Sequence, residues 1–372
     1  MKKHPHDHPH DHTHEHDHVH PHEPMLDRHD HVHPHESTLD RHDHVHPHES
    51  TLDRRALLRT GGLGLGAILL AACTSARSSS TPAEPIDTDT VAPAPTVASL
   101  TTLPGFEQFA ATVNSFVQGD YWMVESNGIP AHDMMVGITS WQQQVPVPQQ
   151  YTDANAWRFP TTPTMADSPV SARTGLFRGA IAIAVNGIPI FNALNNRGDD
   201  ALLAGELDNW GGHAGRADDY HYHVAPLHLQ DIVGPGNPIA YALDGYAIFG
   251  TVEPDGSPLV ELDDYNGHEG SDGTYHYHGT TTYPYINGGL RGVVSVSDQV
   301  DPQPTTRPFR TAGEPLNGAT ITAFHSPSPG AYRLEYSLNG ATGSVFYEVG
   351  ETTIDFTFTD VSGVTKNESY TR

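Results

Sequence analysis

The sequence of 372 residues predicts an all-β or β-dominated fold, sandwich-like or barrel-like. Three observations predict it. Stretches such as 343–360 alternate apolar and polar residues with the period of two that is typical of β-strands. The 35 glycines and 30 prolines suit many short strands joined by turns. The sequence also contains two copies of a unit that consists of a hairpin, an acidic loop and a strand ending in Tyr-His-Tyr-His. We therefore expect an internally duplicated domain of hairpin-loop-strand units.

Residues 1–53 form a histidine-rich leader of low complexity. Eighteen of the 27 histidines lie between His4 and His48, and a segment of 13 residues is present in three near-copies without an apolar pattern. Neutral imidazoles coordinate divalent transition metals, so we interpret the leader as a metal-capturing segment. The alternatives are an expanded repeat with no consequence, or an over-extended start with Met25 as the true first residue.

Residues 54–73 resemble a twin-arginine export signal with a lipid-attachment site. Arg54 and Arg55 are followed by an apolar run of 12 residues, which is too short to cross a bilayer and suits a signal sequence. The run ends in "LAAC", and Cys73 is the single cysteine of the chain. We therefore expect an exported lipoprotein, anchored through Cys73 in the periplasm or on the cell surface. A plain secretory signal is the alternative.

Three segments follow the signal. Residues 74–104 are rich in Ser, Thr, Pro and Ala and are expected to be a disordered linker. Residues 105–305 are expected to form the duplicated domain, and 306–372 a C-terminal β region packed on it. After Ala72 the chain has 12 basic and 33 acidic residues. Such a surface repels nucleic acid, so we expect metal ions as partners and no nucleic acid.

Two tandem units, about 180–223 and 238–278, make up most of the duplicated domain. Each begins with an alternating apolar run that is interrupted by Asn186-Gly187 or Asp244-Gly245, a sequence typical of a two-residue hairpin turn. Their later parts, "GELDNWGGHAGRADDYHYH" and "VELDDYNGHEGSDGTYHYH", align without a gap and are identical at ten of 19 positions. We expect the units to pack about a pseudo-twofold axis that brings equivalent residues together.

Two further regions complete the expected elements. The stretch 106–117, "FEQFAATVNSFV", is the one with a helical pattern. The stretch 320–338 is expected to form two strands across a Ser-Pro loop.

The duplicated histidines are the candidate metal ligands. Successive side chains of a strand point to opposite faces, so the two histidines of each Tyr-His-Tyr-His word share one face. A third histidine precedes each pair by eight residues, and three imidazoles suit zinc or copper. The candidates are His213, His221, His223, His268, His276 and His278. Two sites of three histidines, or one shared site of His221, His223, His276 and His278, both agree with the sequence.

Neighbouring polar and aromatic residues are expected to support this site. Asp208, Asp263 and Asp244 are candidate ligands or acceptors that orient imidazole N–H groups. Tyr222 and Tyr277 are expected to pack in the core. No general base is obviously paired with the histidines, so whether the protein is an enzyme stays open, and Glu206 and Glu261 are the candidates if it is.

Other motifs are weaker. His132 is close to Met134 and Met135, which we interpret as a pair of core methionines rather than a copper site. His228 and His325 have no partners in the sequence and are expected to be structural. The acidic loops do not follow the spacing of a helix-loop-helix calcium site. Nucleophile-elbow and phosphate-loop motifs are missing from the sequence, which disfavours hydrolases of that type and nucleotide enzymes.

The duplicated Tyr-His-Tyr-His motifs and the segments around them resemble those of the bacterial YHYH domain family. The resemblance covers roughly 118–305 and includes "SNGIPAHDMMVGITSWQQQVPVPQ" and "NGHEGSDGTYHYHGTTTYPYINGGLRG". It implies an exported protein of undefined activity. One departure from the family pattern is Ala214, next to His213, because the resemblance implies that relatives often have cysteine at this position.

The sequence thus predicts an exported, lipid-anchored protein that binds zinc or copper, for metal handling or as a metalloenzyme. The alternative is a cell-surface binding or adhesion module that carries structural metal or calcium and has no catalytic activity.

Overall fold

The structure, a computed structural model, describes residues 102–300 and 306–372. The predictions for the histidine-rich leader, for Arg54 and Arg55, for Cys73 and for nearly all of the linker lie outside these ranges. Among the helices of the described ranges, none has both the length and the apolar character needed to cross a membrane.

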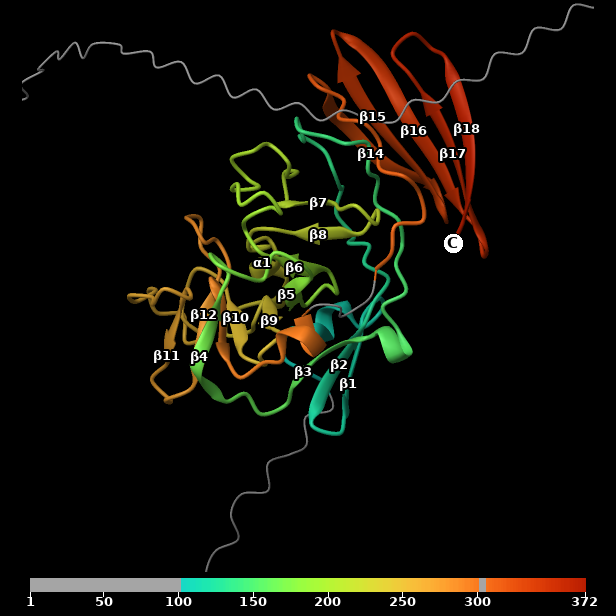
Figure 1. Ribbon diagram of the computed structural model, residues 1–372. Coiled ribbons are helices and arrows are strands. Elements are labelled where there is room, and N and C mark those ends of the chain that lie inside the picture. The colour runs from blue at the N-terminus through green and yellow to red at the C-terminus, as the bar shows by residue number, and fades with distance from the viewer. Residues whose placement is uncertain (1–101, 301–305) are drawn as a thin grey trace, which may run out of the picture. The chain divides into compact units, whose positions relative to one another are not determined.

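The β-dominated prediction is confirmed, and the described strands form four separate sheets rather than one closed barrel (Figure 1). The three-stranded sheet contains β1 (Asn114–Gln118), β2 (Tyr121–Glu125) and β3 (Trp157–Pro160). A two-stranded sheet pairs β4 (Met165–Ser171) with β13 (Gly289–Gly292). The five-stranded sheet contains β14 (Thr320–Ser328), β15 (Ala331–Leu338), β16 (Ala341–Val349), β17 (Thr353–Thr359) and β18 (Thr365–Thr371).

The eight-stranded sheet contains both tandem units. The first unit supplies β5 (Ala180–Ala184), β6 (Pro189–Phe191), β7 (Gly212–Ala214) and β8 (Tyr220–Tyr222). The second unit supplies β9 (Ala240–Ala242), β10 (Ala247–Phe249), β11 (Gly267–Glu269) and β12 (Tyr275–His278). The strand order is β11-β12-β10-β9-β5-β6-β8-β7. All five residues of β5 are buried, as expected for a strand in the middle of a sheet that is covered on both faces.

This strand order is palindromic and has a pseudo-twofold axis at its centre. β5 and β9 pair antiparallel, with Ile183 opposite Tyr241. These two residues are equivalent in the aligned hairpins, so the axis passes between them. The predicted symmetry is therefore present, but it joins the hairpins and puts the two Tyr-His-Tyr-His strands in opposite halves of the sheet.

Helices are few and short in the described ranges. They are η1 (Phe106–Phe109), η2 (Asp153–Asn155), α1 (Leu229–Val233) and η3 (Val296–Val300). The helix expected over 106–117 is wrong beyond its first turn, because 114–118 is strand β1. Pairing of β1 with β2 along five residues overrides the local helical pattern.

Both hairpins are confirmed, but their turns are longer by one residue than predicted. The Gly187 N–H donates to the carbonyl of Ala184, and the Gly245 N–H donates to that of Ala242. Gly187 and Gly245 have φ of 79° and 95°, whereas Asn186 and Asp244 do not have positive φ. This is a three-residue loop with a glycine bulge, and it leaves the Asn186 and Asp244 side chains free to bind tyrosine hydroxyls.

The five-stranded sheet contacts residues that precede the first unit. The Tyr347 hydroxyl donates to the Pro146 carbonyl, and Trp141 packs on Tyr336 with ring centroids 5.3 Å apart. Arg310, in the segment leading to β14, forms a buried ion pair with Asp218 at 2.6 Å. This pair connects the C-terminal region to the loop before β8.

Candidate metal centres

The first cluster consists of His213, His221 and His223, which strands β7 and β8 bring together. His213 lies directly opposite His221 in the register of the two strands, so both side chains project from one face. His223 follows two residues after His221. One ring nitrogen of each residue lies within 4.8 Å of one ring nitrogen of the other two. The predicted grouping of three histidines per unit is therefore what the first unit contains.

Hydrogen bonds in the first cluster leave Nε2 atoms free to bind a cation. His221 Nδ1 lies 2.9 Å from the Asp219 carbonyl, and His223 Nδ1 lies 2.5 Å from the Asn192 carbonyl. A carbonyl only accepts, so each Nδ1 must carry the hydrogen and each neutral ring has its lone pair on Nε2. This is the tautomer that binds metal through Nε2.

Two of these imidazoles face each other through their Nε2 atoms. Nε2 of His223 lies 3.1 Å from Nε2 of His213, and His213 also hydrogen-bonds to the backbone of Glu206. Burial lowers the pKa of His223 to about 3 and lowers that of His213 well below its usual value. At neutral pH both rings are thus neutral, and the single proton of His223 is on the Nδ1 that faces the Asn192 carbonyl. A cation between the two nitrogen lone pairs would stabilise this arrangement.

The second cluster consists of Glu253, His268, His276 and His278, whose ligand atoms lie within 4.8 Å of one another. His268 is opposite His276 in the register of β11 and β12, which repeats the geometry of the first unit. His278 Nδ1 donates to the Gly250 carbonyl at 2.9 Å, and its Nε2 lies 3.2 Å from that of His268. Burial lowers the pKa of His278 to about 4.

Glu253 adds a carboxylate to the potential ligands of the second cluster, whereas those of the first cluster are histidines only. Its oxygens lie 3.1 Å from His268 Nε2, 3.3 Å from His276 Nε2 and 3.7 Å from His278 Nε2. Sequence reasoning missed Glu253. Extending the hairpin alignment beyond Gly250 pairs Glu253 with Asn195, which is not among the potential ligands of the first unit, so the duplication gave no signal for it.

The shared site of four histidines is wrong. The two clusters lie in opposite halves of the palindromic sheet, with the central pair β5 and β9 between them. The reason is that the pseudo-twofold axis passes through the hairpins and not through the strands that carry the histidines.

The carboxylates expected to orient the imidazoles have another role. Asp208 accepts the Tyr220 hydroxyl at 2.7 Å and backbone N–H groups of Met135, Trp210 and Gly212. Asp263 accepts the Tyr275 hydroxyl and Asp244 the Tyr277 hydroxyl, the latter at 2.6 Å. Tyrosines occupy the face of each strand opposite the histidines, so their partners do too. For the histidines whose Nδ1 contacts are described, backbone carbonyls take that position.

The tyrosines of both words are buried in the core, as predicted for Tyr222 and Tyr277. The Tyr222 hydroxyl bonds Asn186 at 3.0 Å and His132 Nε2 at 2.6 Å. Met134 and Met135 are buried, in agreement with a core pair.

Ala214 lies beside His213 on β7, and its N–H contacts the sulfur of Met135 at 3.1 Å. Because neighbouring residues on a strand face opposite ways, a cysteine at this position would point away from the first cluster.

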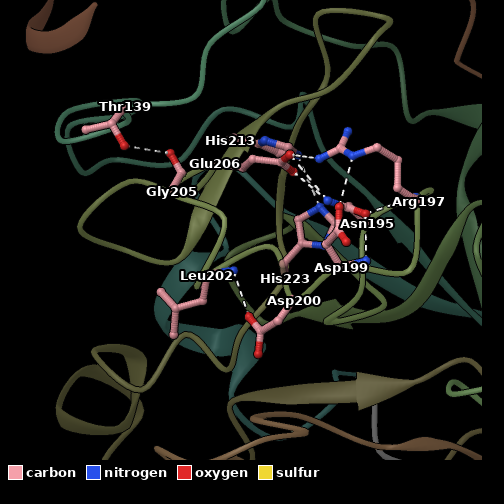
Figure 2. Close-up of polar contacts among 10 residues, drawn as sticks. All are labelled: Thr139, Asn195, Arg197, Asp199, Asp200, Leu202, Gly205, Glu206, His213 and His223. Carbon is pink, nitrogen blue, oxygen red and sulfur yellow. Dashed lines mark hydrogen bonds and ion pairs between the residues drawn. The ribbon is translucent and has the colours of Figure 1, made fainter. Parts of the chain in front are cut away.

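The two glutamates expected as candidate bases differ. Glu206 is buried beside the first cluster, where it forms an ion pair with Arg197 and lies 3.3 Å from Asn195 Nδ2 (Figure 2). Glu261, its counterpart in the second unit, is exposed. Neither belongs to the converging ligand sets.

A cavity of about 590 Å³ opens beside the second cluster. Glu253, His268 and His276 line it, together with aromatic side chains such as Tyr246 and Phe249. None of the histidines of the first cluster lines this cavity. An ion in the second cluster would therefore be reachable by a small molecule.

The lowered histidine pKa values predict a pH dependence of stability in the metal-free protein. The folded-state pKa values of His223 and His278 are about 3 and about 4, against 6.5 for an unperturbed histidine. The unfolded chain therefore binds more protons just below pH 6.5, and the free energy of unfolding falls on acidification. Each group contributes a slope of up to about 1.4 kcal/mol per pH unit.

Urea unfolding in the presence of a chelator between pH 6.5 and about pH 5 measures this slope. In this pH range ordinary carboxylates do not titrate appreciably, because their pKa values are lower. His223→Gln should reduce it, whereas His325→Gln on the exposed part of β14 should not. A His223→Gln protein with an unchanged slope would contradict the assignment.

The fold and the site together define a class of protein. It is a β-rich domain whose duplicated strands bring potential ligands together at two separate candidate metal centres. The comparison with families agrees with the predicted resemblance, because the model of the family described as YHYH protein matches residues 156–258. The match is shorter than the 118–305 expected; it includes the first Tyr-His-Tyr-His word and the second hairpin and ends before the second word. No curated protein and no solved structure matches the chain.

Proposed function

We propose that the protein is an exported, lipid-anchored transition-metal-binding protein that holds zinc or copper in its two clusters. The observation that carries the proposal is the convergence of imidazole Nε2 atoms whose Nδ1 atoms are bound by backbone carbonyls. Imidazole suits both zinc and copper, and a backbone acceptor on the second ring nitrogen holds such ligands in place.

Two observations favour this function over a binding or adhesion module with calcium. Calcium takes six to eight oxygen ligands. Residues 102–300 and 306–372 contain two groups of three or more converging potential ligands, and six of the seven residues in these groups are histidines. The cavity beside the second cluster further favours a metalloenzyme over simple storage, since it leaves room for a substrate at the ion. Export and lipid anchoring rest on Arg54, Arg55 and Cys73 of the sequence.

The test is the metal content of residues 74–372 after purification without chelators, by mass spectrometry. This form contains every residue that the structure describes and lacks the histidine-rich leader. We expect two zinc or copper ions per chain, and none in a His221→Ala/His276→Ala double variant. A protein with no transition metal, whose melting temperature does not change when zinc or copper is added, would contradict the proposal and favour the binding module.

A further inference from the structure

We propose that the two clusters have different tasks: the first is a closed structural centre, and the second is an open centre that binds a small neutral or cationic molecule with a nitrogen or oxygen donor. This inference rests on the proposed function, because the molecule is held by an ion in the second cluster.

The loops beside the two clusters are structurally equivalent, so their residues can be compared one by one. Isolated bridges join Leu194 to Asp200 in the first unit and Val252 to Pro258 in the second. The same hydrogen bonds recur inside, since Asn195 N bonds Asp199 O at 2.8 Å and Glu253 N bonds Ser257 O at 3.0 Å. Position by position, Asn195 corresponds to Glu253, and Arg197 corresponds to Asp255.

In the first unit an ion pair closes the loop over the cluster. Arg197 pairs with Glu206, and Glu206 lies beside His213 and His223 in Figure 2. The Phe191 ring also stacks flat on His221, with centroids 4.0 Å apart and an angle of 16°. These contacts cover the first cluster with protein groups.

In the second unit the same ion pair cannot form. Asp255 stands in place of Arg197, and the counterpart of Glu206 is Glu261, so the two positions carry like charges. Glu261 is exposed, and Asp255 lines the cavity. Phe249, the counterpart of Phe191, meets His276 edge-on at 5.2 Å and 84°. The charge reversal at position 255 thus leaves this loop without the ion pair of the first unit, at the edge of the cavity.

The lining of the cavity indicates the class of ligand. Among its described lining residues none is lysine or arginine, whereas Asp255, Glu269 and Asp272 are acidic. These carboxylates would repel an anionic ligand, and the metal ion of the second cluster would be the positive charge available among the described lining to offset the repulsion. Tyr246 and Phe249 provide aromatic walls that suit a flat apolar body or a cationic group.

Nicotinamide and nicotinate test this inference, since they share a pyridine donor and differ in charge. The readout is the visible absorption of Co²⁺ bound to residues 74–372. We expect nicotinamide to change the Co²⁺ spectrum, and nicotinate to require a concentration higher by about tenfold or more. Asp255→Arg, which allows pairing with Glu261, should weaken nicotinamide binding by about tenfold or more while two ions remain bound.

Matched variants separate the possible failures. Asp255→Asn removes the charge without creating a pair, and it should bind nicotinamide like the wild type. His278→Ala should abolish the response. If two ions bind but nicotinamide has no effect, or nicotinate binds equally well, this inference is wrong and the proposed function stands. If no ion binds at the second cluster, both fail.

Discussion

Replacing His278 with alanine is expected to reduce the bound zinc or copper from two ions to one per chain. His278 Nε2 lies 3.2 Å from His268 Nε2 in the second cluster, and its Nδ1 is fixed by the Gly250 carbonyl. Loss of a directly bound ligand costs more than loss of an outer partner, so we expect the affinity of this cluster to fall by at least about 100-fold. His223→Ala should have the same effect on the first cluster alone, because the clusters lie in opposite halves of the sheet.

Metal analysis after dialysis against a weak chelator measures this effect in residues 74–372. His325→Ala, at an exposed position of β14, is the control and should keep both ions. If either single variant lost both ions, the clusters would depend on each other, and the independence derived from the sheet order would be wrong. Two retained ions in His278→Ala would remove the second cluster from consideration as a metal site.

The local parts of the site could be predicted from the sequence because they depend on short-range rules. A strand places His221 and His223 on one face, and the duplication marked His213 and His268 as additional candidate ligands. The glycines after Asn186 and Asp244 correctly indicated hairpins.

The arrangement of the units could not be predicted in the same way. In the structure β5 and β9 pair at the pseudo-twofold axis. The aligned sequences of the two units would be equally similar if another pair of equivalent strands met there, so the alignment does not identify the pair. Glu253 reaches its cluster through a loop whose path is set by the bridge between Val252 and Pro258. The segment 106–117 fails for a different reason: its helical pattern and its capacity to form a hairpin with the next strand compete locally, and pairing with β2 converts its end into strand β1.

Arg310→Ala is expected to lower the free energy of unfolding by about 3–5 kcal/mol, since it leaves a buried carboxylate without its partner. The side chains of Arg310 and Asp218 are 7% and 2% exposed, and two guanidinium nitrogens lie 2.6 and 2.7 Å from the Asp218 oxygens. Lys366→Ala breaks a pair with Glu368 in which the lysine is 74% exposed, so it should cost less than about 1 kcal/mol. Urea unfolding of both variants measures the difference.

The same substitution should also act on the first cluster. Asp218 directly precedes Asp219, whose carbonyl accepts the His221 Nδ1 hydrogen at 2.9 Å. Disturbing Asp218 moves this acceptor, so Arg310→Ala should weaken metal binding at the first cluster by about 10-fold or more and leave the second unchanged. In an Arg310→Met/Asp218→Asn protein the buried charge is gone, and much of the lost stability should return. Equal loss of metal from both clusters would instead indicate general unfolding, and the specific link from the C-terminal region to His221 would be wrong.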